Sequence, residues 1–389
     1  MSLHNDRYKE LVDEHWGGMN EAAMEQFFYA NNPFALRHWT MNIVEALMII
    51  GALWGLVHAW RAMKHRADPT GLCIWWASIV FLFVVEVPVY FPGLFGQESN
   101  EVFFIHNEFS LGLLFDMTPL YIMALYPALT YPCYLLVKRA GIFDQRGGVI
   151  LGAISAAFIF LPFYQIFDHY GPQFGWWLWD RQNPYLELGL ASVPFGSIVG
   201  YSLCGPLALF LLTGLLIRPF VERRKSGVKS WQKKDGVTLS ALTLVTGFLT
   251  PLLLPWVYPP AYYLLITQTP DPAIMTGLYW GMIAAVIMIG LWQFLRNRTP
   301  KTSPRANGQT GDHASEQAAF KYSWSFFMIY LLVFAGLWVY AMPEYFNAEA
   351  GLTSRGTPIG SIVFVGLCYL VCGFILFRSR QMHARMAGA

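Results

Sequence analysis

Nine long apolar stretches alternate with short polar and charged segments along the chain. The stretches cover residues 41–63, 72–92, 108–137, 149–167, 190–217, 237–259, 273–296, 324–342 and 359–378. About 20 apolar residues are enough for a helix to cross a bilayer. The pattern therefore predicts an all-α fold, a polytopic integral membrane bundle of nine transmembrane helices.

Prolines interrupt the longer stretches. The third contains Pro127 and Pro132, the fifth contains Pro206, and the sixth ends in a cluster that includes Pro255 and Pro259. Because proline removes a backbone donor and bends a helix, neighbouring helices must satisfy the freed carbonyl groups. We expect kinks at these positions and a break at the end of the sixth span.

The composition favours a membrane protein over other classes. Hydrophobic residues make up 55% of the 389 residues and charged residues 13%, against about 25% charged in a typical soluble domain. The mean hydropathy is +0.40. These values exclude a disordered chain and argue against an ordinary cytosolic enzyme. A net charge of +2 gives no reason to expect nucleic acid as a partner.

The positions of Lys and Arg predict the orientation. With the N-terminus outside, only Arg7, Lys9, Arg37, Arg181 and Arg355 of the 26 basic residues lie on the outer side, and the other 21 lie inside. Basic residues gather in cytoplasmic loops. We therefore expect the N-terminus outside, the C-terminus in the cytoplasm and a location in the bacterial inner (cytoplasmic) membrane.

The same pattern divides the chain into five regions. We expect an acidic extracytoplasmic tail (1–39) with a short interfacial helix at 20–30, a five-span bundle (40–217), a basic cytoplasmic loop (218–236), a four-span apolar bundle (237–378) with a flexible cytoplasmic loop at 297–322, and a cytoplasmic tail (379–389). Only the five-span bundle carries acidic residues inside its predicted spans.

Four carboxylates lie inside the predicted spans: Glu45, Glu86, Glu108 and Asp116. Lys and Arg, in contrast, occur only at the inner ends of the spans (Arg61, Arg296 and Arg378). A lone carboxylate in hydrocarbon costs on the order of 3 kcal/mol, so it usually faces the bundle interior and has a function. All four fall in the outer half of the bilayer. On a helix, Asp116 would lie about 12 Å deeper than Glu108. We expect one polar cavity that opens to the outer side and has Asp116 as its floor.

Further polar and aromatic side chains are expected around this cavity. His106 would exchange protons with solvent, and the predicted substrate-binding residues are Asn107, Asp168, His169, Trp176, Tyr90 and Phe115. Burial and mutual repulsion favour the protonated form of clustered acids, and a protonated acid can act as a general acid. Aromatic rings can stabilise a cation in a dry site.

These residues suggest an enzyme that acts on an apolar isoprenoid-type lipid (carotenoid, sterol or terpenoid) within the bilayer, as a hydratase, isomerase or cyclase. Asp116 or Glu86 would donate the proton, and Glu108 or Glu45 would act as the base or stabilise the cation. The string at 105–109 is similar to the His and Glu pairing of sterol isomerases, but its spacing differs, so it implies no residue role. Cofactor motifs such as a phosphate-binding loop or H-E-x-x-H are absent from the sequence, and we expect no cofactor.

Other interpretations remain open at this point. Each acid except Asp116 has an equally good structural explanation, as a hydrogen-bonded packing residue or a helix-end residue. The chain could instead be a proton- or cation-coupled transporter, a scaffold, or a metal-dependent enzyme. The metal ligands would then come from Glu86, His106, Glu108, Asp168 and His169.

Overall fold

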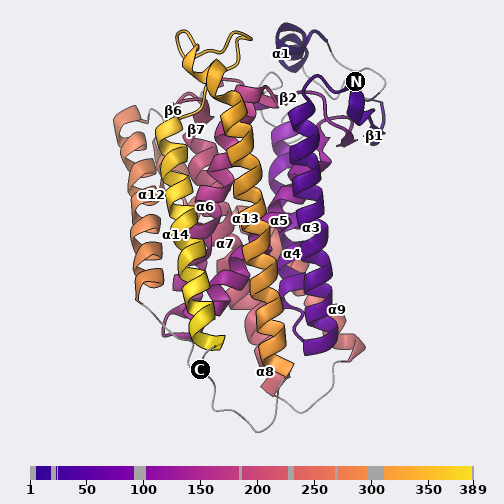
Figure 1. The fold of residues 1–389 in the computed structure, drawn as a ribbon, viewed down its shortest axis with the longest axis vertical. Coiled ribbons are helices and arrows are strands. Elements are labelled where there is room, and N and C mark those ends of the chain that lie inside the picture. The colour runs from indigo at the N-terminus through magenta and orange to yellow at the C-terminus, as the bar shows by residue number, and fades with distance from the viewer. Residues whose placement is uncertain are drawn as a thin grey trace.

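Nine long helices make up most of the computed structural model, which describes residues 6–18, 23, 25–91, 102–183, 186–226, 232–267, 270–296 and 311–387. Within these residues, nine helical segments are long and apolar enough to cross a membrane. They stand side by side with roughly parallel axes (Figure 1). The predicted all-α bundle is confirmed at the level of nine long apolar helices in the described residues, and these helices are typical of a multi-pass membrane protein.

The helices follow the apolar stretches closely. They are α3 (Trp39–Arg66), α4 (Thr70–Tyr90), α5 (Leu120–Arg139), α6 (Gly148–Phe174), a fifth run made of η4 (Gly196–Cys204), α7 (Gly205–Leu212), η5 (Thr213–Ile217) and α8 (Arg218–Ser226), then α9 (Lys233–Leu252), α12 (Pro272–Leu295), α13 (Gly311–Phe346) and α14 (Ile362–Ala387). In the fifth run, η4 and η5 are π-helical. Such wide turns are uncommon and often occur at functional sites.

Helix α6 lies at the centre of the bundle. It packs against α5, α7, α12 and α14. Two of its contacts depend on glycine: a Cβ on Gly171 would lie 1.9 Å from the ring of Trp177, and a Cβ on Gly290 of α12 would lie 2.2 Å from the ring of Phe158. Only a residue without a side chain allows such close approaches. These two glycines therefore fix how α12 and the cap pack against α6.

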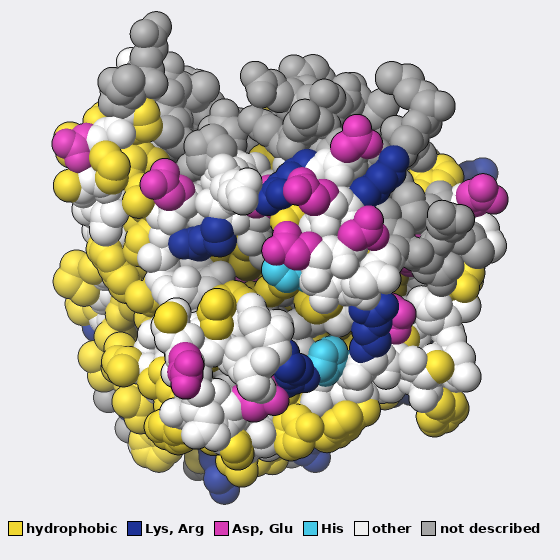
Figure 2. Space-filling view, turned by 90° about the horizontal axis from the view of Figure 1, so that it is seen from above, with side chains coloured by type: hydrophobic (Ala, Val, Ile, Leu, Met, Phe, Trp, Pro, Cys, Tyr) yellow, Lys and Arg dark blue, Asp and Glu magenta, His cyan; other side chains and the backbone are white. Residues whose placement is uncertain are grey.

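A cap of short strands and one helix covers the N-terminal end of the bundle (Figure 1). It contains α1 (Asp6–Trp16) and three antiparallel sheets: β1 (Phe28–Ala30), β3 (Leu111–Leu113) and β4 (Thr118–Pro119); β2 (Phe104–His106) with β5 (Trp177–Trp179); and β6 (Gly189–Leu190) with β7 (Val193–Pro194). Figure 2 shows acidic and basic side chains gathered on this face, with hydrophobic side chains around its rim. The C-terminus lies at the opposite end.

The predicted start of the third span is wrong. Helix α5 begins at Leu120, so Glu108 and Asp116 lie in the cap and not on a membrane-spanning helix. Leu114, Phe115 and Asp116 all have positive φ angles, a backbone conformation that a right-handed helix cannot contain. This segment was predicted to be part of a span because it is apolar. In the structure its apolar side chains pack against those of α1 instead.

Two loops also differ from the prediction. Helix α13 already begins at Gly311, so the second half of the loop predicted at 297–322 is helical, and residues 297–310 lie outside the described residues. The basic segment predicted as a loop at 218–236 begins with α8 and ends in the first turn of α9; residues 227–231 lie outside the described residues.

The tail and the sixth span can be compared with the prediction in the same way. The helix in the tail is α1. In the segment expected to form an interfacial helix at 20–30, the last three residues form strand β1 instead. Residues 19–22 and 24 lie outside the described residues. The predicted break after the sixth span is confirmed, because α9 is followed by two short helices, α10 (Leu254–Val257) and α11 (Pro259–Ile266).

Candidate functional site

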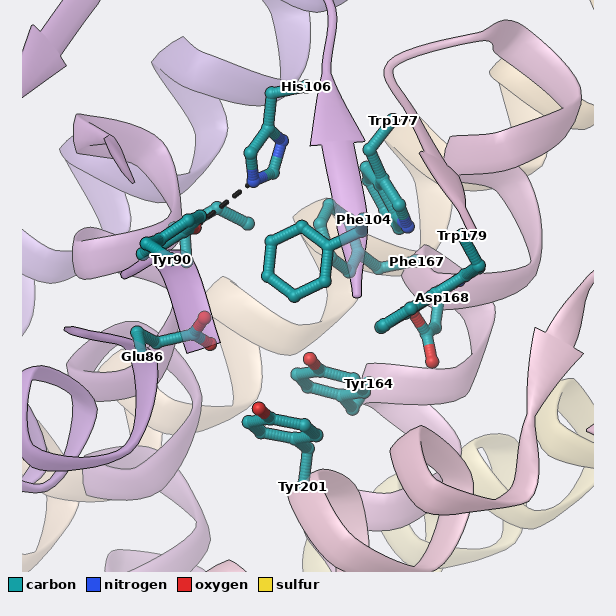
Figure 3. A pocket seen from close by; sticks show the side chains of 11 residues that line it. Glu86, Tyr90, Phe104, His106, Tyr164, Phe167, Asp168, Trp177, Trp179 and Tyr201 are labelled. Carbon is teal, nitrogen blue, oxygen red and sulfur yellow. Dashed lines mark hydrogen bonds between the residues drawn. The ribbon is translucent and has the colours of Figure 1, made fainter. Parts of the chain in front are cut away.

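A small cavity lies where the cap meets the bundle. It leaves about 30 Å³ for the centres of water molecules, which is room for about two waters. Its walls come from α4, α5, α6 and η4, and β2 and β5 contribute from the cap (Figure 3). The lining residues are Glu86, Tyr90, Phe104, His106, Ile122, Tyr164, Phe167, Asp168, Trp177, Trp179 and Tyr201.

Two buried carboxyl groups belong to this lining. Glu86 comes from α4 and is 6% exposed, and Asp168 comes from α6 and is 1% exposed. In the view of Figure 3 they lie on opposite sides, with Tyr164 and Tyr201 between them. The lining, which lies wholly in the described part of the chain, includes no Lys or Arg. The site therefore combines two acids with no Lys or Arg in its wall.

The two acids differ in how they are held. Asp168 accepts a hydrogen bond from Ser197 Oγ at 2.6 Å and one from Gln165 Nε2 at 3.3 Å. In contrast, Oε2 of Glu86 is buried and has no hydrogen-bond partner among the described residues. Asp168 is thus fixed in orientation by its neighbours, while Glu86 keeps an oxygen available for a bound molecule.

His106 reaches the cavity from strand β2. Its Nε2 lies 3.1 Å from the hydroxyl of Tyr90, and burial lowers the pKa of His106 to about 3. The ring is therefore neutral at physiological pH. It packs edge-on against Phe104, which also contacts Tyr90 and Trp179. Aromatic rings thus surround the histidine and form much of the wall.

Three polar atoms of the lining have no partner within the described part of the chain: Glu86 Oε2, His106 Nδ1 and Trp179 Nε1. Buried polar atoms in proteins are nearly always hydrogen-bonded. Water or a polar group of a ligand in the cavity would give such atoms a partner.

Glu45 and Glu108 do not line the cavity. Glu45, on α3, accepts hydrogen bonds from the backbone N–H of Ser110, at 2.8 Å, and from its hydroxyl. The side chain of Glu108 is 41% exposed, and its Oε1 lies 3.5 Å from Nε of Arg37. The contacts of Glu45 join α3 to the cap, while Glu108 forms a half-exposed ion pair with a residue that precedes α3.

Asp116 does not form the floor of the cavity, and this prediction is wrong. It lies in the turn between β3 and β4 with φ of +63°, because the chain reverses direction there instead of continuing as a helix. Burial, together with the charge of Glu108, raises the pKa of Asp116 to about 7. Its neighbour Phe115 packs edge-on against Phe27, with ring centroids 6.2 Å apart.

Three other predicted residues lie outside the lining and are hydrogen-bonded to other segments. Asn107 Nδ2 donates to the carbonyl of Gly175 at 2.8 Å. Trp176 Nε1 donates to Thr40 Oγ1 at 3.1 Å. His169 Nδ1 accepts a hydrogen bond from the backbone N–H of Ser361, just before α14, at 3.2 Å.

Sequence reasoning missed several residues of the site. Tyr201 and Ser197 lie four residues apart in the fifth apolar stretch, and this spacing could have indicated a polar face on one helix. Trp177 and Trp179 alternate with Leu178 and precede an aspartate, a period of two that is typical of a strand. Such a strand, paired with β2, brings both indole rings to the cavity.

The five proposed metal ligands are not brought together. Glu86, His106 and Asp168 share the cavity, whereas Glu108 and His169 lie outside its lining. No group of three or more His, Cys, Asp or Glu in the described residues is placed to hold a metal ion. The geometry gives no support to the metal-dependent alternative.

Comparisons of the chain with family models, curated proteins and solved structures gave no match. The interpretation of the site therefore rests on its own geometry and chemistry.

Proposed function

We propose that the chain is a membrane-embedded enzyme that acts on an apolar isoprenoid-type lipid by acid–base chemistry at a C=C bond, as a hydratase, isomerase or cyclase. The observation that carries this proposal is the pair Glu86 and Asp168, two buried carboxyl groups that line one aromatic cavity whose wall contains no Lys or Arg. General acids and bases of this kind do not need a cofactor.

The roles follow from the environment of each acid. Protonated Glu86 would transfer its proton to one alkene carbon, so that a C–H bond forms and the π bond breaks. The resulting cation would be stabilised by the surrounding aromatic rings. Asp168, oriented by Ser197 and Gln165, would remove a proton from a neighbouring carbon, which restores a double bond. In a hydratase it would instead take a proton from the attacking water.

The size of the cavity adds a requirement. A lipid is far larger than two waters, so part of the wall must move to admit one. On the cap side, the wall of the cavity is formed by β2 and β5, which have only three residues each. A pair of such short strands is marginally stable by itself. This cap-side wall is the part that we expect to move.

The distribution of charge supports an orientation. Among the described residues, the basic side chains of α8 and of the last turns of α3 and α5 lie at the end opposite the cap. By the positive-inside rule this end would face the cytoplasm and the cap would face outside. We propose this orientation, with the bacterial inner membrane as the location.

The test is mass spectrometry of lipids extracted from a host that expresses the native chain or one of three variants. In the host with the native protein, we expect a lipid that has gained one water or changed its isomer retention time. Glu86→Gln and Asp168→Asn should each lower the product by about 10²–10⁴-fold. Glu349→Gln, at an exposed position beyond α13, is the control and should leave the product unchanged. Identical lipid profiles for all four hosts would overturn the proposal.

A proton- or cation-coupled transporter is the second candidate. It is favoured by the unpaired Glu86 Oε2 in an aromatic cavity and by the break between α9 and α10. In proteoliposomes, a transporter would take up protons or an organic cation down a pH gradient, and Glu86→Gln would abolish the flux. The enzyme proposal predicts no such flux.

A further inference from the structure

An exposed aromatic side chain lies on a short turn where the cap meets the bundle. The turn is η1 (Pro33–Ala35), a single 3₁₀ turn, and Phe34 at its centre is 95% exposed. The side chain of Asn32 accepts the backbone N–H of Phe34 at 3.0 Å, which closes the turn. A single exposed apolar residue is common on protein surfaces, so its meaning depends on where the turn lies and on what surrounds it.

One hydrogen bond sets the height of the turn along the bundle. Nδ2 of Asn42, the fourth residue of α3, donates to the carbonyl of Pro33 at 2.7 Å. Because this side chain is short, η1 lies beside the first turn of α3, whereas α1 lies beyond the end of that helix (Figure 1). Helix α3 is long and apolar enough to cross a membrane. Phe34 is therefore level with the start of a candidate membrane span.

Apolar surface continues from this level along the bundle. Trp39, the first residue of α3, is 54% exposed, and its ring packs edge-on against Tyr340 of α13 at a centroid distance of 5.3 Å. Ile50 follows Trp39 by 11 residues, which is about three helical turns, so the two lie on one face of the helix. Leu53 and Val57 are exposed on the same face. This face of α3 has the character of a surface that contacts lipid chains.

Exposed ion pairs lie on the other side of the same level. Arg37, two residues before Trp39, has its Nε 3.5 Å from Oε1 of Glu108. At the same end of α13, Oε2 of Glu344 lies 2.7 Å from Nη2 of Arg355. These four side chains are 37–41% exposed, and such charged groups require contact with water. The surface thus changes from charged to apolar at the level of Trp39 and of η1, the position that aromatic side chains favour at a membrane boundary.

We propose that η1 anchors the cap in the membrane, and that Phe34 inserts between the lipids of the leaflet on the cap side. Lipid is the partner that this surface fits, because the surface continues a face of a candidate membrane span and ends at a layer of exposed ion pairs. The turn is also tied to the cap. Asn31 Nδ2 donates to the carbonyl of Phe109, and its backbone N–H donates to the carbonyl of Ser110, both at 2.8 Å. The proposal does not rest on the proposed acid–base reaction, so either can fail without the other.

The test measures the depth of a nitroxide spin label on the full chain in liposomes of dioleoylphosphatidylcholine. Three single variants carry the label: Phe34→Cys, Ile50→Cys on the apolar face of α3, and Glu10→Cys on the exposed side of α1. The five native cysteines are buried, and the unsubstituted chain reports any label that they take up. Electron paramagnetic resonance compares how often each label collides with oxygen, which concentrates among the acyl chains, and with a water-soluble nickel chelate.

We expect the label at position 34 to collide more often with oxygen than with the chelate, at a depth of about 5–10 Å inside the membrane boundary. The label at position 50 should show the same preference at greater depth, and the label at position 10 should show the opposite preference. Asn42→Ala removes the hydrogen bond to Pro33. It should shift the label at position 34 toward water and leave the label at position 50 at its depth.

Two outcomes would overturn the proposal. The same preference for the chelate at positions 34 and 10 would mean that the turn lies in water. A label at position 34 that neither oxygen nor the chelate reaches would mean that another protein surface covers it. Because Phe34 is 95% exposed, its replacement leaves the fold intact, and the label at position 50 shows how deeply α3 lies in the same liposomes.

Discussion

Helices α6 and α12 are built from similarly apolar sequences but occupy opposite environments. Of the most apolar stretch of each helix, 78% is buried in α6 and 28% in α12. They differ in polar residues: α6 carries Gln165, Asp168 and His169 within five positions, while α12 carries Thr276 and Gln293 far apart. In a bilayer, apolar content does not distinguish a central helix from a peripheral one, because lipid chains are as apolar as the protein interior. Clustered polar residues do distinguish them.

The largest expected effect is on packing in the central helix. Phe160→Ala removes a ring that is fully buried on α6, and the cavity left behind should lower the free energy of unfolding by about 3–5 kcal/mol. Titration with SDS in mixed micelles measures this change. A loss below about 1 kcal/mol would mean that α6 is not packed as the comparison requires.

The next effect concerns the link between the bundle and the cap. Glu45→Ala leaves the N–H and the hydroxyl of Ser110 without their acceptor. This should lower the free energy of unfolding by about 1–3 kcal/mol. Hydrogen exchange of residues 107–113 should become faster. Glu10→Ala, on the exposed face of α1, serves as the control. Unchanged exchange in Glu45→Ala would contradict the structural role given to this acid.

A smaller, pH-dependent effect is expected at Asp116. The pKa of its carboxyl is raised to about 7 by burial and by the charge of Glu108, whereas in the unfolded chain it is about 4. Between these values the folded state binds more protons, so stability falls as the pH rises from about 4 to about 7. The slope is at most about 1.4 kcal/mol per pH unit.

Asp116→Asn tests this directly, because an amide does not titrate. The native chain should lose melting temperature between pH 4.5 and pH 7.5, and the variant should lose less. If both chains lost the same amount, the pH dependence would have to come from other groups.

The smallest effect is expected on the outer face of α14. Leu370 is 71% exposed, so Leu370→Ala exchanges one hydrocarbon contact for another and should change the free energy of unfolding by less than about 0.5 kcal/mol. The SDS titration used for Phe160→Ala measures both. A loss of 2 kcal/mol or more would show that this face is packed against another protein surface.

The apolar stretches alone predicted the number of long helices. In a bilayer, a single segment of about 20 apolar residues can pair all its backbone groups within itself only as a helix. They failed at the start of the third span. There the apolar residues around Phe115 pack beneath α1, and the positive φ angles from Leu114 to Asp116 depend on tertiary contacts that no local pattern contains.

The residues of the site were predicted only in part, because tertiary contacts also decide which side chains reach the cavity. Glu86, His106, Asp168 and Tyr90 were among the expected residues, and all four line one cavity. Asp116 was expected beside them because a helix was assumed to run from residue 108 to residue 137. The helix begins only at Leu120, so this expectation was wrong. Tyr201 was missed because its position in the cavity depends on how η4 packs against α6, which the sequence of the fifth stretch does not specify.

The neighbours Asp168 and His169 also differ in when their partners are synthesised. Ser197, which donates to Asp168, follows 29 residues later, while Ser361, which donates to His169, follows 192 residues later. At about 5–20 residues per second, the first partner is made within about 6 seconds and the second only after about 10–40 seconds. During translation Asp168 is therefore hydrogen-bonded early, and His169 waits for the last helix. The arrival of α14 thus supplies the partner of His169 Nδ1 on a helix made long before it.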